Sequence, residues 1–316
     1  MRRPSLVFAL GTVLLAALSC SSPPPASAPT GPGRHESGAP STSTTLSRPD
    51  HIVVIVMENK EYDSIIGSSD APYINKLARH SVLLTREYAI RHPSLPNYLA
   101  LTGGATFGII SDCTTCYVSK SNLVDQLEQN GYSWKAYMQS MPYACYTGSS
   151  AGTAPRDYAA KHDPFIYYDD VRLDPERCNE IVPFTVLKRE DLKHGLPDFA
   201  WITPNECHDM HSCPVATGDE FLQTWAPKIL KRLGKDGILI VTFDEGSTNA
   251  GCCSNAGGGH VATIIAGPGA GKGVRLGIKS THYSLLRLIE DAWGLKRMRH
   301  AAGDGTPKIK GWRAGA

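Results

Sequence analysis

Apolar residues along this chain gather in short runs that alternate with amphipathic stretches. Two of the runs, HIVVIVM (51–57) and GILIVTF (237–243), are almost entirely aliphatic or aromatic. Continuous runs of this length are typical of strands that are buried on both faces, as in a parallel sheet. Further strands are predicted for VLLTREYAI (82–90), SWKAYM (133–138), DFAWIT (198–203) and HVATIIAG (260–267).

Helical patterns separate these strands. APYINKLARH has Pro72 near its start, where a missing N–H costs nothing, and another helix opens at Pro96. Ser121 and Gly131 suit the two ends of SNLVDQLEQNG. DEFLQTWAPKILKRLG and YSLLRLIEDAWG are the remaining predicted helices. Strands that alternate with helices indicate an α/β fold with a largely parallel sheet.

One long stretch, residues 140–195, shows no such periodicity and is rich in Tyr, Pro and Asp. An irregular segment of this length is uncommon in a compact domain and is usually functional. We therefore expect it to be an irregular loop that forms a wall of the site.

The N-terminus has the pattern of an export signal. Arg2 and Arg3 precede an apolar stretch of about a dozen residues, which is too short to span a bilayer and suits a signal peptide. Ser19 and Cys20 then predict lipoprotein cleavage, with simple secretion as the alternative. We expect residues 1–20 to be a signal peptide of lipoprotein type. The protein would then be exported and lipid-anchored on the outer face of the cell membrane, or secreted.

The remaining sequence divides once. Residues 21–48 are rich in Pro, Ser, Gly and Thr and nearly lack large apolar side chains, so they predict a disordered linker. Residues 49–316 contain neither a second linker nor an internal repeat and are expected to form one catalytic domain. The net charge is +2 and the Lys and Arg residues look unclustered, which argues against a nucleic-acid partner. We expect a monomer that meets the membrane only through its anchor.

Nine cysteines are present, and removal of Cys20 leaves eight. An even number in an exported protein predicts disulfides. A zinc knot is one alternative, and a redox pair in the CTTC stretch is another, while the connectivity stays open at this point. The eight lie in local pairs: Cys113 with Cys116, Cys145 with Cys178, Cys207 with Cys213, and Cys252 with Cys253.

Polar side chains follow four predicted strands, at the edge where an open α/β sheet binds ligands. Glu58 and Asn59 follow HIVVIVM, and Asp244 and Glu245 follow GILIVTF. Each pair alone is explained by capping of the next segment. Together, carboxylates at adjacent strand ends would repel unless a cation lay between them. Their oxygens suit a hard divalent cation, so the sequence predicts a metal or phosphate site.

RHPSLPNYLALTGG (91–104) holds Ser94 just ahead of a helix, between Pro93 and Pro96. Rigid flanking residues favour in-line attack by the hydroxyl. A helix N-terminus also favours a phosphate and a developing alkoxide, and a nearby cation would lower the pKa of the hydroxyl. We interpret Ser94 as a nucleophile, with a helix N-cap as the alternative. Asn97 would donate to a phosphate oxygen or stabilise the turn.

The cluster CHDMH places Asp209 between His208 and His211. Two histidines three residues apart, with an acid between them, suit a second metal or a general acid that is oriented by a carboxylate. A polar loop braced by a disulfide is the alternative. In the long loop, His162 would reach a phosphate or lie on the surface. His260 and His282 would each have either a role in the site or a structural role. The Gly-rich segments GGGH and GPGAGKG lack the spacing of a P-loop.

Together, VMEN, HPSLPNYLALTGG, KHDPF, PNECHDMH, VTFDEG and GGGHV resemble the phosphoesterase family of bacterial acid phosphatases and phospholipase C enzymes. That family lies in the alkaline phosphatase-like superfamily, so the resemblance implies a three-layer α/β/α sandwich with a largely parallel central sheet. It implies a divalent cation (Mg²⁺, Ca²⁺, Mn²⁺ or Zn²⁺) held by Glu58, Asn59, Ser94, Asp244 and Glu245. It implies catalytic roles for Ser94, Asp209 and His211. The expected substrate contacts are Asn97, His162, His208, His260 and His282.

The HPS-x-PNY pattern resembles the phosphatase branch of that family. We therefore expect a phosphomonoesterase that acts on small-molecule or lipid phosphate esters, phosphoinositides included, through a phosphoseryl intermediate. A phospholipase C-type phosphodiesterase is one alternative. A lipid-anchored lipoprotein that binds phosphate or metal without turnover is another.

Overall fold

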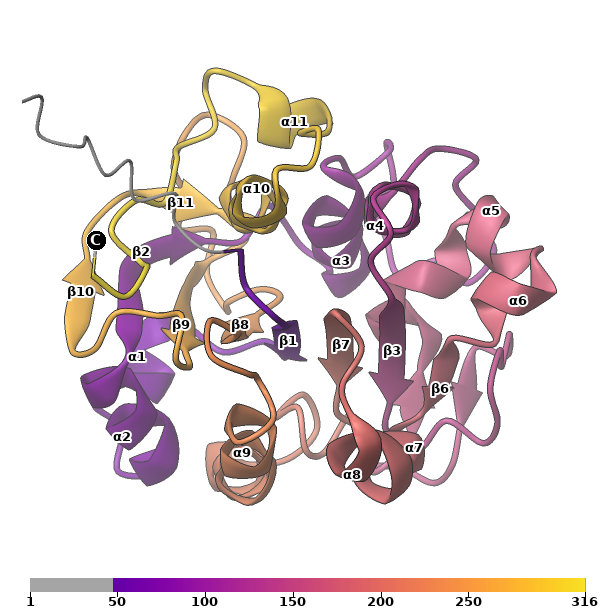
Figure 1. Ribbon diagram of the computed structural model, residues 1–316, viewed down its shortest axis with the longest axis horizontal. Coiled ribbons are helices and arrows are strands. Elements are labelled where there is room, and N and C mark those ends of the chain that lie inside the picture. The colour runs from indigo at the N-terminus through magenta and orange to yellow at the C-terminus, as the bar shows by residue number, and fades with distance from the viewer. Residues whose placement is uncertain (1–47, 316) are drawn as a thin grey trace, which may run out of the picture. The chain divides into compact units, whose positions relative to one another are not determined.

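A nine-stranded sheet forms the centre of residues 48–315, the part of the chain that the computed structural model describes (Figure 1). The predicted signal peptide (1–20) and all but the last residue of the predicted linker (21–48) lie outside the described residues. The strands of this sheet are β1 (Ile52–Met57), β2 (Val82–Tyr88), β3 (Trp134–Met138), β6 (Ile181–Pro183), β7 (Phe199–Thr203), β8 (Ile238–Phe243), β9 (His260–Ala266), β10 (Val274–Leu276) and β11 (Ser280–Thr281).

The order across the sheet is β10-β2-β9-β8-β1-β7-β3-β6, with β11 paired to β2. β1 lies between β7 and β8 and is parallel to both. β9 is antiparallel to its neighbours β8 and β2, whereas the other pairs are parallel. The predicted, largely parallel sheet is confirmed, with β9 as its reversed strand. The carboxyl ends of β1, β2, β7 and β8 consequently share one edge with the start of β9.

Helices cover both faces of the sheet (Figure 1). Alternate side chains of β1 pack into two apolar clusters, because successive residues of a strand point to opposite faces. One cluster includes α3 (Ser94–Gly103), α4 (Leu123–Gln129) and α10 (His282–Trp293). The other includes α2 (Pro72–His80) and α9 (Val215–Leu230). The predicted three-layer α/β/α arrangement is therefore confirmed. In residues 48–315, no helix has the length and apolarity that a membrane crossing requires.

Short elements fill residues 140–195, so the prediction of an irregular loop there is wrong. β6, three residues long, adds the edge strand next to β3, and it is too short to show an alternating pattern. Its neighbours are β4 (Ser150–Ala151), β5 (Tyr158–Ala159), η1 (Ala160–His162), η2 (Pro164–Tyr167), α5 (Asp169–Arg172), α6 (Pro175–Cys178), α7 (Phe184–Val186), η3 (Leu187–Asp191) and α8 (Leu192–His194). The remaining short helices are α1 (Tyr62–Ile65) and α11 (Arg299–Ala302).

The cap of α4 differs from the predicted one by a single residue. Asn122, not Ser121, accepts a hydrogen bond from Val124 N at 2.8 Å, and Asp125 accepts from Asn122 N at 2.9 Å. Both residue types cap helices well, so adjacency in the sequence could not decide between them. The helix ends as predicted near Gly131, whose φ is +76°.

The eight cysteines form four disulfides, so the disulfide interpretation is confirmed against the zinc and redox alternatives. Three of the bonds join cysteines no more than 6 residues apart, and the fourth joins cysteines 33 residues apart. Two of the short-range bonds brace loops near the carboxyl edge of the sheet. The pairs are Cys113–Cys116, Cys145–Cys178, Cys207–Cys213 and Cys252–Cys253.

Candidate active site

Ser94 lies at the carboxyl edge of the sheet, where it is the first residue of α3. The helix begins two residues before Pro96, with Pro93 as its N-cap. The Ser94 hydroxyl lies 3.2 Å from Glu58 Oε2 and 3.3 Å from Glu245 Oε1. Only 1% of Ser94 is exposed. The ends of β1, β2 and β8 thus bring one hydroxyl and two carboxylates together, as the strand-end argument predicts.

Asn59 and Asp244 complete this group. The backbone N–H of Asn59 donates to Asp244 Oδ1 at 3.1 Å. One end of the Asn59 amide lies 3.1 Å from Glu58 Oε2 and 3.2 Å from both Asp244 Oδ1 and Glu245 Oε1. As an NH₂ group this end would donate to the three carboxylates, and as an oxygen it would share a cation with them. Oxygens that converge without a hydrogen between them repel, and a cation among them removes the repulsion. This donor set therefore fits a hard divalent cation.

The acids of the site are buried, and burial is the main influence on their pKa values. Burial, followed by the charge of Glu245, raises the pKa of Asp244 to about 7. Burial and the nearby charges of Asp244 and Asp209 raise the pKa of Glu58 well above its ordinary value. Asp244 Oδ2 is buried and has no hydrogen-bond partner among the described residues. A bound cation would favour the ionised form of these carboxyls and give such an oxygen a partner.

His162 lies between two of the buried acids. Its Nε2 is 3.3 Å from Glu58 Oε2, and its Nδ1 is 3.5 Å from Asp209 Oδ2. Burial, then the charges of Lys161 and His211, lowers the pKa of His162 well below its ordinary range. A neutral imidazole carries one N–H, so it can donate to only one of these acids. Ligand atoms of Glu58, His162 and Asp209 lie within 4.8 Å of one another, so they could hold a cation of their own.

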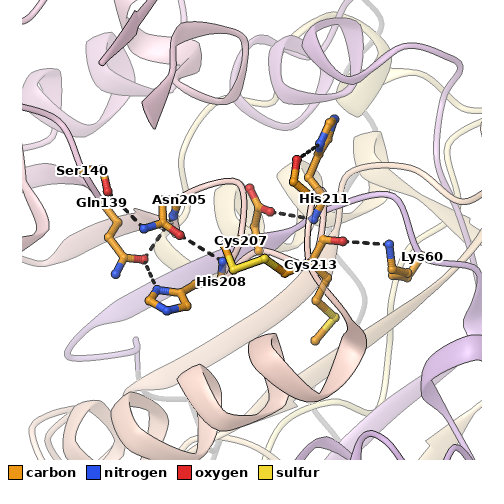
Figure 2. The surroundings of a disulfide bond; sticks show 11 residues. Lys60, Gln139, Ser140, Asn205, Cys207, His208, His211 and Cys213 are labelled. Carbon is orange, nitrogen blue, oxygen red and sulfur yellow. Dashed lines mark hydrogen bonds between the residues drawn. A yellow bond between two sulfur atoms is a disulfide. The ribbon is translucent and has the colours of Figure 1, made fainter. Parts of the chain in front are cut away.

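The loop after β7 carries Asp209 and His211 and is closed by the Cys207–Cys213 disulfide (Figure 2). Asp209 Oδ1 accepts from His211 N at 2.8 Å, and Lys60 Nζ donates to the carbonyl of the intervening residue at 2.8 Å. His211 Nε2 lies 3.3 Å from Lys161 Nζ. The His211 ring is 5.6 Å from the His162 ring. Asp209, His162 and His211 therefore form one wall beside Glu58.

A glycine allows α9 to pack against this loop. A Cβ on Gly218 would lie 2.9 Å from the carbonyl oxygen of His208 and 2.5 Å from the side chain of Met210. Only a residue without a side chain fits there, so Gly218 allows the loop that carries Asp209 and His211 to lie close against α9.

Four of the predicted substrate contacts form hydrogen bonds with other groups of the fold. His208 Nδ1 lies 3.0 Å from Gln139 Oε1, on the other side of the disulfide from His211 (Figure 2). His260 is stacked on the rings of Tyr62 and Tyr88 and bonds the carbonyl of Thr85. Both histidines are explained by packing and hydrogen bonds within the fold.

The side chains of Asn97 and His282 also form hydrogen bonds with backbone groups around the site. The Asn97 amide accepts from the N–H groups of Ile90 and Arg91 and donates to the carbonyls of Arg91 and Pro93. The structure thus favours the turn-stabilising alternative for Asn97 over donation to a phosphate. His282 is fully buried, and its Nε2 contacts the carbonyl of Asp244.

Two side chains that are not among the predicted site residues orient the carboxylates. The Tyr98 hydroxyl donates to Glu58 Oε1, and its ring stacks on His162 with centroids 5.6 Å apart. His92 Nδ1 contacts Glu245 Oε2. Tyr98 lies four residues after Ser94, on the same face of α3, so helical spacing could have identified it.

A lysine and an aspartate were also missed. Lys161 Nζ is 3.4 Å from Asp112 Oδ2, and Asp112 Oδ1 accepts from Leu95 N at 3.0 Å. Lys161 directly precedes His162, but Asp112 lies in a polar loop and gives no sequence signal. The amide of Leu95, in the first turn of α3, is therefore already hydrogen-bonded.

Comparison with known proteins identifies the family. Residues 68–296 match the Phosphoesterase family. A phosphate-repressible acid phosphatase of Penicillium chrysogenum is 32% identical over 275 residues, which cover 84% of this chain and 62% of that protein. An acid phosphatase of Aspergillus fumigatus is 30% identical over 82% of this chain and 56% of its own length. The chain therefore spans less than two thirds of these fungal relatives.

A bacterial relative is matched over more of its length. A phosphatidylinositol-3-phosphatase of Mycobacterium tuberculosis is 32% identical over 264 residues, which cover 79% of each protein. Among solved structures, a protein of the alkaline phosphatase superfamily from Vibrio parahaemolyticus aligns with a TM-score of 0.53 at 14% identity, over 84% of this chain and 72% of that one. This chain has the alkaline phosphatase-like fold and belongs to the phosphoesterase family.

Proposed function

We propose that this protein is a phosphomonoesterase whose nucleophile is the hydroxyl of Ser94. The observation that carries the proposal is the position of that hydroxyl, within 3.3 Å of carboxylates from two other strand ends. Relatives that are named acid phosphatase and phosphatidylinositol-3-phosphatase support a phosphate monoester, small or lipid-borne, as the substrate.

The proposal includes export. Four disulfides are typical of proteins that fold in an oxidising compartment. The proposed lipid anchor at Cys20 lies outside the described residues. The catalytic domain, residues 49–316, is proposed to act as a monomer.

Glu58, Asn59, Ser94, Asp244 and Glu245 would hold a divalent cation, since three carboxylates, the serine hydroxyl and one end of the Asn59 amide converge in the structure. When bound, such a cation supplies Lewis-acid chemistry: it polarises a phosphoryl oxygen and lowers the pKa of the serine hydroxyl.

The residues of the chain account for the movement of protons and bonds. Ser94 gives its proton to Glu58 or Glu245, and its oxygen forms a bond to phosphorus as the bond to the leaving oxygen breaks. A histidine, His211 or its neighbour His162, gives a proton to that leaving oxygen and releases the alcohol. Water then attacks the phosphoserine. The water oxygen bonds to phosphorus and its proton passes to the histidine that protonated the leaving group. The Ser94–phosphorus bond breaks, the carboxyl of Glu58 or Glu245 returns its proton to the serine oxygen, and inorganic phosphate leaves.

Replacement of Ser94 tests this function. We expect Ser94→Ala to reduce hydrolysis of p-nitrophenyl phosphate by about a thousandfold or more, because the variant lacks the hydroxyl that is proposed to attack phosphorus. Ser64→Ala, which removes an exposed hydroxyl on α1, is the matched control and should leave turnover unchanged. Circular dichroism checks that both variants are folded. Unchanged turnover in folded Ser94→Ala would refute the nucleophile.

The products separate a monoesterase from a phospholipase C-type enzyme. With a phosphatidylinositol phosphate as substrate, the proposed reaction releases inorganic phosphate and leaves the lipid intact. Release of diacylglycerol would contradict the proposal and favour a diesterase. Retention of phosphate without turnover of any ester would favour a binding protein.

A further inference from the structure

A groove rich in positive charge, which we call the basic groove, lies beside the second half of α9. Its volume is about 690 Å³. Five of its seven lining residues are Lys or Arg, and none is acidic. The lining residues are Lys188, Arg189, Leu192, Trp225, Lys228, Lys231 and Arg232.

The five cationic side chains have no anionic partner in residues 48–315. No ion pair or side-chain hydrogen bond within those residues involves any of them. The acids nearest to them in sequence are engaged elsewhere: Glu190 pairs with His194 at 3.9 Å, and Asp191 pairs with Lys135 at 3.4 Å. Like charges that converge without a counter-charge create a positive potential, which attracts anions.

The indole ring of Trp225 forms one wall of the groove, and two of the ammonium groups lie over it. Lys228 Nζ is 4.2 Å from the centroid of its ring, and Lys188 Nζ is 5.9 Å from it. The Trp225 ring also packs edge-on against Phe184, with centroids 5.1 Å apart and planes at 89°. The tryptophan therefore joins ammonium groups from two different elements in one half-buried place.

A helix dipole does not explain the whole groove. Cations near the carboxyl end of a helix are favourable, which accounts for Lys228, Lys231 and Arg232 at the end of α9. It does not account for Lys188 and Arg189, which come from η3. The expectation that the Lys and Arg residues are unclustered is wrong here, because the fold brings residues 188–189 against residues 228–232.

The basic groove is remote from Ser94. α9 starts just after the loop that carries Asp209 and His211, and its 16 residues are about 24 Å long. The groove lies along the last turns of that helix, toward the edge where the described chain begins and Asp236 N donates to Asp50 Oδ2 at 3.1 Å. A ligand in the groove would consequently leave the carboxyl edge of the sheet free.

We propose that the basic groove binds a polyanion that carries several phosphate groups, at a site separate from the active site. Its volume lies within the range of about 300–1,000 Å³ that small-molecule sites occupy. Lys and Arg donors suit phosphate oxygens, and the aromatic wall suits the apolar part of a ligand. The phosphates could belong to a free polyphosphorylated compound or to a lipid headgroup.

Calorimetric titration of the full chain with tripolyphosphate tests the proposal. Ser94→Ala is present throughout, so that the probe is not hydrolysed. We expect the added changes Lys188→Glu, Lys228→Glu and Arg232→Glu to weaken binding by about tenfold or more, since each reverses a charge at the site. The control changes Lys272→Glu, Lys279→Glu and Lys310→Glu alter the net charge equally at exposed lysines elsewhere and should leave binding unchanged. Equal loss in both triple variants, or no binding of tripolyphosphate at all, would overturn the proposal.

Two further arms complete the test. With Ser94 intact, the groove variant should hydrolyse p-nitrophenyl phosphate as fast as the unmodified protein, which also shows that it is folded. Sedimentation with phosphatidylcholine vesicles, with and without a phosphatidylinositol phosphate, distinguishes the sources. If the unmodified protein sediments more with the phosphoinositide vesicles and the groove variant does not, the phosphates belong to a lipid. Tripolyphosphate binding without that extra sedimentation assigns them to a free compound.

Discussion

Each of the two carboxylates beside Ser94 is held by a second contact. The Tyr98 hydroxyl donates to Glu58 Oε1, which leaves Oε2 to face Ser94. His92 contacts Glu245 Oε2, which leaves Oε1 to face Ser94. Groups of this kind fix the direction of a ligand or base without touching the substrate. Tyr98 and His92 are therefore positioning residues in the proposed mechanism.

Tyr98→Phe should weaken the site without unfolding the protein. Loss of the hydroxyl frees Glu58 Oε1, and second contacts of this type are commonly worth about 10–100-fold in metal affinity or activity. We expect kcat for p-nitrophenyl phosphate to fall by about tenfold, and the metal concentration for half-maximal activity to rise. The control is Tyr137→Phe, which removes another buried hydroxyl, bonded to Asp191. An equal loss in both variants would assign Tyr98 to structure alone.

The wall of His162 and His211 predicts a dependence on the leaving group. If either histidine protonates the leaving oxygen, its replacement by Asn should slow hydrolysis of an alkyl phosphate much more than hydrolysis of p-nitrophenyl phosphate, whose product leaves readily as an anion. The expected difference for the responsible residue is about 10²-fold. Rates for the two substrates measured on both variants would provide the test. Equal losses on the two substrates in both variants would exclude a general-acid role for this pair.

At the scale of elements, the turn that leads into α3 is held by backbone contacts from the Gly-rich segment before β9. Gly257 N donates to the carbonyl of Ile90 at 2.9 Å, and Gly258 N donates to that of Ala89 at 3.0 Å. A Cβ on Gly258 would lie 2.6 Å from both N and O of Arg91. The glycines of the GGGH stretch thus allow its backbone to lie directly against the backbone of residues 89–91, just ahead of Ser94.

Gly258→Ala should therefore displace the turn that carries Ser94. Real Cβ atoms do not approach backbone atoms so closely, so the turn must shift, and small misplacements of a nucleophile can reduce the rate by about 10²-fold. Gly257→Ala is a matched control, because nothing lies within 4 Å of a Cβ at that position. We expect a large fall in kcat for the first variant and little change for the second. Similar kinetics in the two variants would show that the turn is not fixed by this contact.

The carboxyl of Glu290 gives α10 a pH-dependent contribution to stability. Burial raises the pKa of Glu290 to about 8, and its Oε1 accepts from Met298 N at 2.8 Å. The folded protein keeps this proton up to about that pH, whereas the unfolded chain loses it near 4.5. Unfolding between these values releases a proton, so the free energy of unfolding should fall as the pH rises from 5 to 8.

Glu290→Gln should remove this part of the pH dependence. The amide oxygen can still accept from Met298 N, and no charge has to form in the buried site. Urea denaturation at pH 5 and pH 8 should show a smaller fall in the variant, with a difference on the order of 4 kcal/mol as an upper bound. Glu220→Gln, at an exposed position of α9, should leave the fall unchanged. A fall in Glu290→Gln as steep as in the unmodified protein would contradict the assignment.

At the scale of the whole molecule, strand order decides what could be predicted from the sequence. Continuous apolar runs identified β1 and β8, and the polar residues after them could be assigned to one edge because parallel strands end together. The sequence could not show that β9 is reversed, because a buried run looks alike in both directions. It also could not separate His208 from His211, since the direction of each ring depends on partners such as Gln139 that lie far away in sequence.

Dependence on tertiary contacts also explains why the role of Asn97 and the basic groove could not be predicted from the sequence. The sequence allows Asn97 to be a phosphate donor, but the turn that occupies its amide groups forms only when residues 90–93 fold back on α3. Lys188 and Arg189 lie about forty residues from the end of α9 in the chain and meet it only through tertiary packing. Side chains that act through distant partners leave no local pattern to read.

The central claim is that the hydroxyl of Ser94 receives the phosphoryl group of the substrate. The direct measurement is acid quenching of the protein during turnover of a phosphate monoester, followed by peptide mass spectrometry. We predict phosphoserine at residue 94, and no phosphopeptide from the Ser94→Ala variant. Phosphate on a different residue, or turnover without any trapped phosphoprotein under conditions where release is slowed, would contradict it.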